Sequence, residues 1–332
     1  MIFQAPILAL LLVAALAAIV SLWSAGFGLS VLRHWDVASG SRAQIRLERK
    51  TELVSTLFGF VMLAELAALL LFVYNADRLA ALFVGAMCAV GTLNVNAWGF
   101  PALYLKIAVF FTAALWLMLD RADRLGRDYP LAKVKYAAIL PMAGLVVASG
   151  AVELTYFLGL ETDVITSCCS KLFTPVNEGL ASEMTGLGPA AALWMLAGTG
   201  AVVAATGAIS LVTGRGQIWF AIAGVAMFAV SLAAIVSVIS LYVYDHPNHH
   251  CPFCLLQREH GYYGYVLYLP LFAGTAFSLG AGVTALFHRV GSLEQSLPAM
   301  TRRLVLAGLG GFGLFGLAVI WAIAASRLIL FG

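Results

Sequence analysis

The chain has 332 residues, of which 62% are hydrophobic and only 11% are charged, and its formal net charge is +3. A soluble globular domain carries roughly 25% charged residues, so the composition excludes an ordinary soluble enzyme or binding module. The cations lie in short connecting segments rather than in one basic tract, and no nucleic-acid partner is expected. We therefore expect an all-α polytopic protein in a lipid bilayer.

Nine apolar runs predict the helices in chain order. A run of about 18 or more apolar residues is long enough to cross a bilayer, and no cleavable signal peptide is recognised in the first run. The third run is short and ends in an Asn/Gly/Pro-rich stretch, so residues 79–101 either cross the bilayer or form a re-entrant segment. The sequence thus predicts eight or nine transmembrane helices, over 5–32, 53–74, 79–92, 102–119, 136–158, 189–213, 218–244, 253–287 and 304–326.

Lys and Arg residues predict the orientation, because cytoplasmic loops carry an excess of both. The basic connections 120–135, 214–216 and 288–303 alternate along the chain and are expected inside. The loops that carry the cysteine pairs are then expected on the periplasmic face of a bacterial inner membrane. The basic segment 33–50 conflicts with this orientation if there are nine spans, and agrees with it if 79–101 is re-entrant.

Four of the five cysteines form two close pairs in helix-connecting loops. Cys251 and Cys254 form a CxxC motif at the expected start of the eighth helix, where exposed N–H groups and the helix dipole stabilise a thiolate. Arg258, one helical turn later, adds a positive charge. Cys168 and Cys169 are adjacent, and a disulfide between neighbours is strained and readily reduced. This placement predicts thiol redox chemistry.

Histidines surround the CxxC motif in the pattern HxxHHCxxC. Imidazole and thiolate together suit zinc, copper or haem iron, although a polar loop at a membrane surface has the same composition. His260 is interpreted either as a proton donor of a redox site or as an interfacial residue. The alternative to redox chemistry is a metal or haem protein, for copper delivery or cytochrome assembly, with His246, His249 and His250 as ligands.

Three charged residues lie within the apolar runs, where charges are costly and are either paired or functional. An ion pair between Glu65 and Lys106 is the structural interpretation. With Glu153, the same residues would serve a transporter, and an integral subunit of a respiratory complex is a further alternative. Cys88, alone in the third run, is interpreted as a packing residue.

The segment Cys251-Pro-Phe-Cys254-Leu-Leu-Gln-Arg258 resembles the CxxC-x-x-x-Arg segment of DsbB-type quinone-linked disulfide-forming proteins. The order of elements over 136–287 resembles the related vitamin K epoxide reductases. In those proteins a helix, an outer loop with a cysteine pair, two helices and a CxxC-bearing helix form a four-helix bundle. The resemblance implies a four-helix redox bundle over 136–287, an added membrane module over 1–135, and a basic loop and last helix over 288–332.

The resemblance also implies a membrane thiol-disulfide oxidoreductase. An external thioredoxin-like dithiol protein would reduce the Cys168–Cys169 pair, which would in turn reduce Cys251–Cys254. A membrane quinone, ubiquinone or menaquinone, would accept the electrons beside Arg258 and His260. No metal cofactor is expected, because thiols held as ligands cannot exchange disulfides. Subunits of a membrane complex are the other class of partner.

Overall fold

The computed structural model describes residues 4–36, 39–126, 128–161, 164–166, 188–328 and 330. Within these residues the secondary structure is entirely helical, and large apolar side chains cover much of the exposed surface, which suits contact with lipid. The expected all-α polytopic membrane fold is confirmed. In the described part of the chain, eight helical segments are long and apolar enough to cross a membrane: Ala5–His34, Arg42–Leu82, Gly99–Asp123, Ala132–Leu158, Pro189–Thr213, Gln217–Tyr244, Tyr263–Ala285 and Leu297–Ala325.

Residues 79–101 do not form a ninth span. Between the end of α2 (Arg42–Leu79) and the start of α4 (Gly99–Asp123) lie only the 3₁₀ turn η1 (Ala80–Leu82) and the short helix α3 (Ala89–Leu93). A helix of five residues is about 7.5 Å long, whereas the hydrocarbon core of a bilayer is about 30 Å thick. Of the two alternatives predicted from the sequence, the structure therefore favours eight spans.

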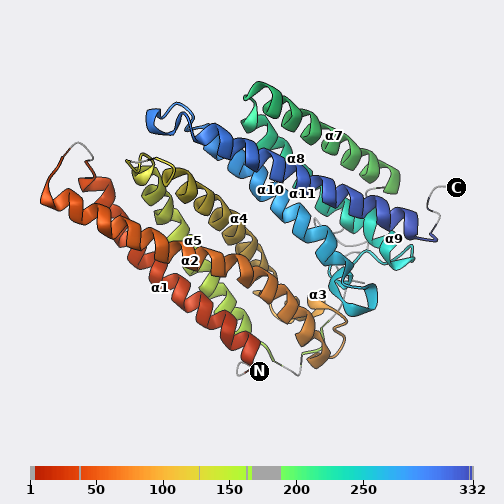
Figure 1. Cartoon of the computed structure of the whole chain (residues 1–332). Helices are drawn as coiled ribbons and strands as arrows, with labels where there is room; N and C mark the ends of the chain where they lie inside the picture. Colours follow the sequence, from red (N-terminus) through yellow and green to blue (C-terminus); the bar gives the residue numbers. More distant parts are fainter. Residues whose placement is uncertain are drawn as a thin grey trace. The chain divides into compact units, whose positions relative to one another are not determined.

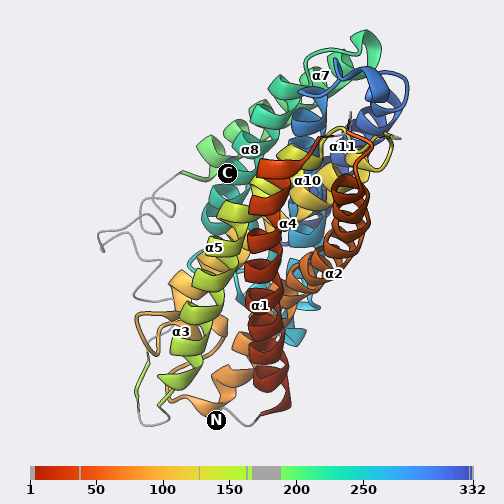
Figure 2. The same ribbon diagram turned by 90° about the vertical axis from the view of Figure 1, so that its left-hand side faces the viewer.

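Compactness divides the chain into two units, and the first comprises Met1–Asn75, Leu93–Thr162 and Leu286–Leu297. It contains α1 (Ala5–His34), most of α2, α4 and α5 (Ala132–Leu158) (Figure 1). Helix α5 packs against both α1 and α4, and Figure 2 shows α1 and α5 side by side. The aromatic rings of Phe58 and Trp116 meet edge to face at 4.6 Å in the core of this unit.

A buried ionic cluster lies inside the first unit. The Nζ atom of Lys106 on α4 lies 3.2 Å from a carboxylate oxygen of Glu65 on α2 and 2.9 Å from one of Glu153 on α5. The three side chains are at most 2% exposed. The predicted ion pair between Glu65 and Lys106 is confirmed, and Glu153 is a second partner of the same lysine.

The second unit comprises Ala76–Thr92, Asp163–Ala285 and Pro298–Gly332. Its long helices are α7 (Pro189–Thr213), α8 (Gln217–Ala234), α10 (Tyr263–Ala285) and α11 (Leu297–Ala325) (Figure 1). Helix α8 packs against α7 and α10, and α11 approaches α10 so closely that a Cβ atom at Gly311 would lie 2.7 Å from the backbone of Gly274. The four-helix grouping of this unit begins at α7, because α5, expected to be its first member, packs in the first unit.

The CxxC motif does not cap a long helix. The helix expected from residue 253 begins at Tyr263, and the motif is followed by two 3₁₀ turns, η3 (Cys254–Leu256) and η4 (Arg258–His260). Gly261 and Tyr262 both have positive φ, +62° and +56°, so an α-helix cannot run through them. The prediction that the dipole of this helix stabilises a thiolate in the motif is therefore wrong.

Candidate thiol site

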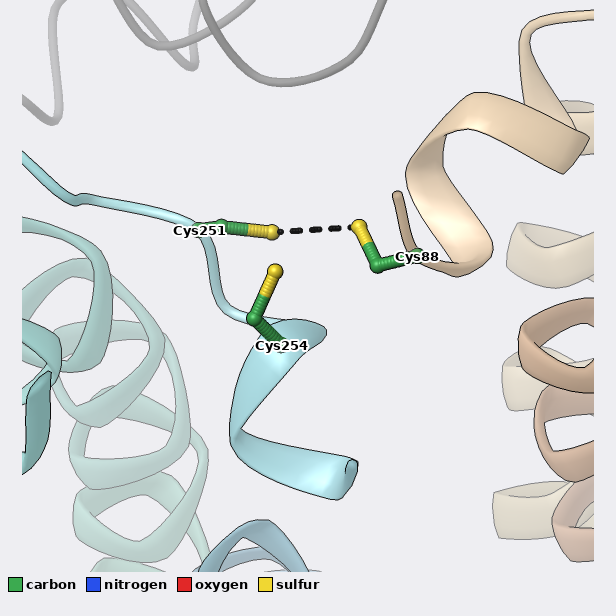
Figure 3. Close-up of side chains that lie close together, drawn as sticks. All are labelled: Cys88, Cys251 and Cys254. Carbon is green, nitrogen blue, oxygen red and sulfur yellow. Dashed lines mark hydrogen bonds between the residues drawn. The ribbon is translucent and has the colours of Figure 1, made fainter. Parts of the chain in front are cut away.

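Three cysteine thiols meet in the second unit. Cys88 directly precedes α3, and Cys251 and Cys254 belong to the connection between α9 (Ser240–Tyr244) and α10. The Sγ atoms of Cys88 and Cys251 are 3.5 Å apart, and the three sulfur atoms all lie within 4.8 Å of one another. Figure 3 shows the three side chains pointing toward a common centre. Cys88 and Cys251 are 0% exposed and Cys254 is 5% exposed.

The Gln257 side chain fixes the two cysteine segments relative to each other. Its amide nitrogen donates hydrogen bonds to Oδ1 of Asp77 at 3.0 Å and to the carbonyl oxygen of Met87 at 2.7 Å. Met87 is the neighbour of Cys88, and Gln257 follows Cys254 by three residues. The position of Cys88 is thus set by a side chain of the same loop that carries the CxxC motif.

A second contact holds the other side of the Cys88 segment. The N–H group of Thr166 donates to the carbonyl oxygen of Val84 at 3.1 Å, and its hydroxyl group donates to that of Gly91 at 2.7 Å. Gly85 has a φ of +87°, and a Cβ atom there would collide with the carbonyl oxygen of Thr166. The close approach of Thr166 and the left-handed backbone together require glycine at position 85.

Two tyrosines hold the backbone of the CxxC motif. The hydroxyl group of Tyr244 donates a hydrogen bond to the carbonyl oxygen of Cys251, and that of Tyr268 donates to the carbonyl oxygen of Pro252 at 2.9 Å. Buried carbonyl groups need such donors, because leaving one without a partner costs about 1–3 kcal/mol. The short CxxC connection is therefore anchored to helices on both sides of it, α9 and α10.

Two histidines of the loop differ in their expected charge. A hydrogen bond to the sulfur of Cys251, aided by contact with Cys254, raises the pKa of His249 to about 9 in spite of its partial burial. Burial lowers the pKa of His260, and the charge of His249 lowers it further. The ring of Tyr244 lies between them, with ring centroids 4.1 Å from His249 and 4.4 Å from His260. At neutral pH, His249 is a cation beside the thiols and His260 is neutral.

The other two histidines have separate partners. The Nδ1 atom of His250 lies 2.9 Å from the carbonyl oxygen of Val236, in the π-helical turn η2 (Ile235–Ile239) that joins α8 to α9. Because a carbonyl oxygen can only accept, Nδ1 carries the proton and donates. His246 is exposed, and its Nδ1 atom accepts a hydrogen bond from the N–H group of Asn248 at 3.2 Å. The structure does not gather His246, His249 and His250 around one point.

Two further predicted site residues lie in η4, after the CxxC motif. Arg258 is exposed, and His260 is partly buried. Cys168 and Cys169 lie outside the described residues.

Cys88 was interpreted from the sequence as a packing residue, and the structure buries it completely, but in contact with a cysteine of the CxxC motif. Its contact with Cys251 joins residues 163 positions apart, which no local spacing reveals. One signal was nevertheless present in the sequence. With eight spans among the described residues, the connections 83–98 and 245–262 lie on the same face, so Cys88, Cys251 and Cys254 belong to one side.

The arrangement suits two kinds of chemistry. Thiol-disulfide exchange needs a thiolate next to a second sulfur, and a cation such as His249 stabilises the thiolate. A zinc ion with four sulfur or nitrogen ligands at about 2.3 Å places neighbouring sulfurs about 3.8 Å apart, which three sulfurs within 4.8 Å approach. Comparison with family models, curated proteins and solved structures found no match for this chain.

Proposed function

We propose that the protein is a membrane thiol-disulfide oxidoreductase that passes electrons from an external dithiol protein to a membrane quinone. The observation that carries the proposal is the cluster of three buried thiols beside the cationic His249. In one turnover the dithiol protein loses two electrons and two protons and becomes a disulfide. The quinone gains both electrons and both protons and leaves as a quinol.

The distribution of basic residues supports a location of the thiols on the outer face. With eight spans the connections alternate between two faces, and 14 of the 19 Lys and Arg residues lie in or beside the connections of one face. The excess of Lys and Arg is typical of the cytoplasmic side, and disulfides persist on the opposite side. The basic segment 33–50 conflicted with this orientation for nine spans, and with eight spans it lies on the same face as the other basic connections. The fourteen are Arg33, Arg42, Arg46, Arg49, Lys50, Arg121, Arg124, Arg127, Lys133, Lys135, Arg215, Arg289, Arg302 and Arg303.

The pair Cys168–Cys169 is the proposed entry point for electrons from the partner protein. Thr166 is bonded to Val84 and Gly91, on either side of Cys88, and it precedes Cys168 by only two residues. Two residues of extended chain span about 7 Å. We therefore propose that the adjacent pair exchanges disulfides with the buried cluster.

The quinone is proposed from the resemblance to DsbB-type proteins and from Arg258. This arginine is four residues after Cys254, exposed, and close in sequence to the first turn of α10. A guanidinium group at a membrane boundary can donate hydrogen bonds to a carbonyl oxygen of a quinone that arrives from the lipid. His260, partly buried and neutral at rest, is proposed to take up a proton from solvent and pass it to the reduced quinone.

The test is dithiol-dependent quinone reduction by the purified full-length protein. A reduced thioredoxin-like protein and a short-chain ubiquinone or menaquinone are supplied, and quinol formation is followed by absorbance. We expect turnover by the wild-type protein, loss of turnover in Cys251→Ser and Cys254→Ser, and slower turnover in Arg258→Met. The matched control is Glu259→Gln, because Glu259 is exposed next to Arg258. Wild-type turnover in the Cys254→Ser variant would refute the proposal.

A soft-metal site is the second candidate, because the same three sulfurs can ligate copper(I) or zinc. His249 can supply a fourth ligand once a metal ion displaces its proton. Elemental analysis of protein purified without added metal separates the two functions. One copper or zinc per chain, lost in Cys88→Ser and in Cys251→Ser, would favour the metal site. A chain free of metal whose thiols oxidise to disulfides favours the oxidoreductase.

A further inference from the structure

We propose that Cys88 is a third redox-active residue, which exchanges with the CxxC motif by forming a disulfide with Cys251. This inference deepens the proposed oxidoreductase function and rests on it. Its basis is the 3.5 Å separation of the two Sγ atoms, which are within hydrogen-bonding distance of each other. Closing this gap to the bond length of a disulfide, about 2.05 Å, needs a movement of about 1.5 Å.

The surroundings of Cys88 differ from those of a cysteine that only fills space. A buried structural cysteine behaves as a small apolar residue among apolar neighbours. The sulfur of Cys88 instead faces the sulfurs of Cys251 and Cys254, all within 4.8 Å (Figure 3). Three thiols in one buried cluster, contributed by segments far apart in sequence, make exchange between them the simplest chemistry of the cluster.

The contacts of Gln257 preserve this geometry. Because its side chain binds the carbonyl oxygen of Met87 while its own backbone N–H donates to the carbonyl oxygen of Cys254 at 3.0 Å, one residue joins both sides of the cluster. The second bond of the amide, to Asp77, fixes the end of α2 to the same loop. If Cys88 only filled space, nothing would require the adjacent Met87 to be bonded to the loop that carries the CxxC motif.

The exchange step is balanced without an external oxidant or reductant. The thiolate of Cys88 attacks the Cys251 sulfur of the Cys251–Cys254 disulfide. The Cys88–Cys251 bond forms, the Cys251–Cys254 bond breaks, and Cys254 leaves as a thiolate. The proton of the Cys88 thiol passes to solvent or to a neighbouring base, and the side chain of His249, which contacts both cysteines of the motif, lies beside the Cys254 thiolate that leaves. No electrons enter or leave, and the step frees Cys254.

The experiment traps this disulfide in the full-length protein. Cys168→Ser and Cys169→Ser are introduced together, so that only the three clustered cysteines remain. In this background Cys254→Ser leaves Cys88 and Cys251, and Cys88→Ser leaves the CxxC pair. Each protein is oxidised with diamide in detergent, free thiols are alkylated, and linked peptides are identified by mass spectrometry without reduction.

We expect a Cys88–Cys251 linked peptide in most molecules of the Cys254→Ser variant, and a Cys251–Cys254 linked peptide in the Cys88→Ser variant. The reverse control is Cys251→Ser, in which a link between Cys88 and Cys254 is expected at lower yield. A free, alkylated Cys88 in the Cys254→Ser variant would overturn the inference. A Cys88–Cys254 link in the Cys251→Ser variant, together with no Cys88–Cys251 link in the Cys254→Ser variant, would overturn it as well.

Three features of the experiment separate the Cys88–Cys251 link from failure of the proposed function, from poor folding and from metal binding. The trap does not use quinone turnover, so the proposed function can fail while the Cys88–Cys251 link is still present, or the reverse. It also leaves Cys88 intact in the decisive variant, so poor folding of a Cys88 substitution does not affect it. Oxidation is run with and without a chelator, because thiols that become oxidisable only after chelation belong to a metal site and overturn the inference.

Discussion

Replacement of Lys106 by methionine tests whether the buried charges of the first unit are held as a balanced cluster. Methionine keeps most of the aliphatic stem of lysine and removes only the ammonium group. Glu65 and Glu153, which are 2% and 0% exposed, then lose their positive partner at 3.2 Å and 2.9 Å. Removing one member of a buried ion pair typically costs about 3–5 kcal/mol.

The cost of protonating a buried glutamate gives a similar estimate of the lost free energy of unfolding. Two glutamates and one lysine balance when one glutamate carries a proton, so the variant avoids a buried unpaired carboxylate by taking up one further proton. For a glutamate with an ordinary pKa of about 4.3 this costs about 3.7 kcal/mol at pH 7. We therefore expect Lys106→Met to lower the free energy of unfolding by about 3–5 kcal/mol at pH 7, and by less as the pH falls toward 5.

The assay is denaturant unfolding of the purified protein in detergent, followed by circular dichroism. The matched control is Lys133→Met, which removes an exposed lysine of α5, where a surface charge contributes about 0–1 kcal/mol. The triple variant Glu65→Gln, Lys106→Met, Glu153→Gln removes the charges together and is expected to lie within about 1–2 kcal/mol of the wild type. A triple variant as unstable as Lys106→Met, or a single variant as stable as Lys133→Met, would refute the reasoning.

The remaining predictions concern the thiol loop. His249→Gln should slow alkylation of Cys251 at pH 7, measured by mass spectrometry, because it removes the cation beside the sulfur. In the wild-type protein the stabilisation that depends on protonated His249 is fully present below pH 6.5 and is lost as the pH rises through about 9, so thermal unfolding should show a decline over this window that His249→Gln lacks. Gln257→Leu should reduce the yield of the Cys88–Cys251 link, whereas Glu259→Gln should not; equal yields would remove Gln257 from the argument. In intact cells an impermeant maleimide should label Asn248→Cys and not Ser292→Cys, both at exposed positions, in a background without Cys168 and Cys169; the opposite pattern would reverse the orientation.

Much of the fold follows from simple features of the sequence. Apolar runs longer than about 18 residues locate every long helix, because nothing shorter crosses the hydrocarbon core. The ion pair of Glu65 with Lys106 also follows from the cost of burying a single charge. The added partner, Glu153, depends on how α5 packs against α4, and helix packing is not encoded in local spacing.

The start of α10 shows where local patterns mislead. Phe253, Leu255 and Leu256 continue the apolar run of the eighth helix, so periodicity places them in it. The backbone is instead turned by left-handed residues at 261 and 262. Gly261 signals such a turn, because glycine is often the residue that ends a helical segment, but Tyr262 gives no such signal. The apolar residues of this loop are buried without being helical, since Leu255 and Leu256 are 0% and 7% exposed and Leu256 lies close to Gly264 of α10.

The burial of the three thiols bears on how electrons reach them. A partner protein must bring its own sulfur into contact with the sulfur that it attacks, yet Cys88 and Cys251 are 0% exposed and Cys254 is 5% exposed. Direct attack on the CxxC motif by a folded partner is therefore blocked in this conformation, whereas exchange within the chain is not. In the proposed oxidoreductase a cysteine of this chain would then carry electrons inward, and Cys168 and Cys169 follow Thr166 by two and three residues in the sequence. Burial would also protect a disulfide formed within the cluster from small thiols in the surroundings. For the proposed oxidoreductase, the burial that hides the cluster from a partner is therefore an argument for a relay of internal thiols over a single exposed pair.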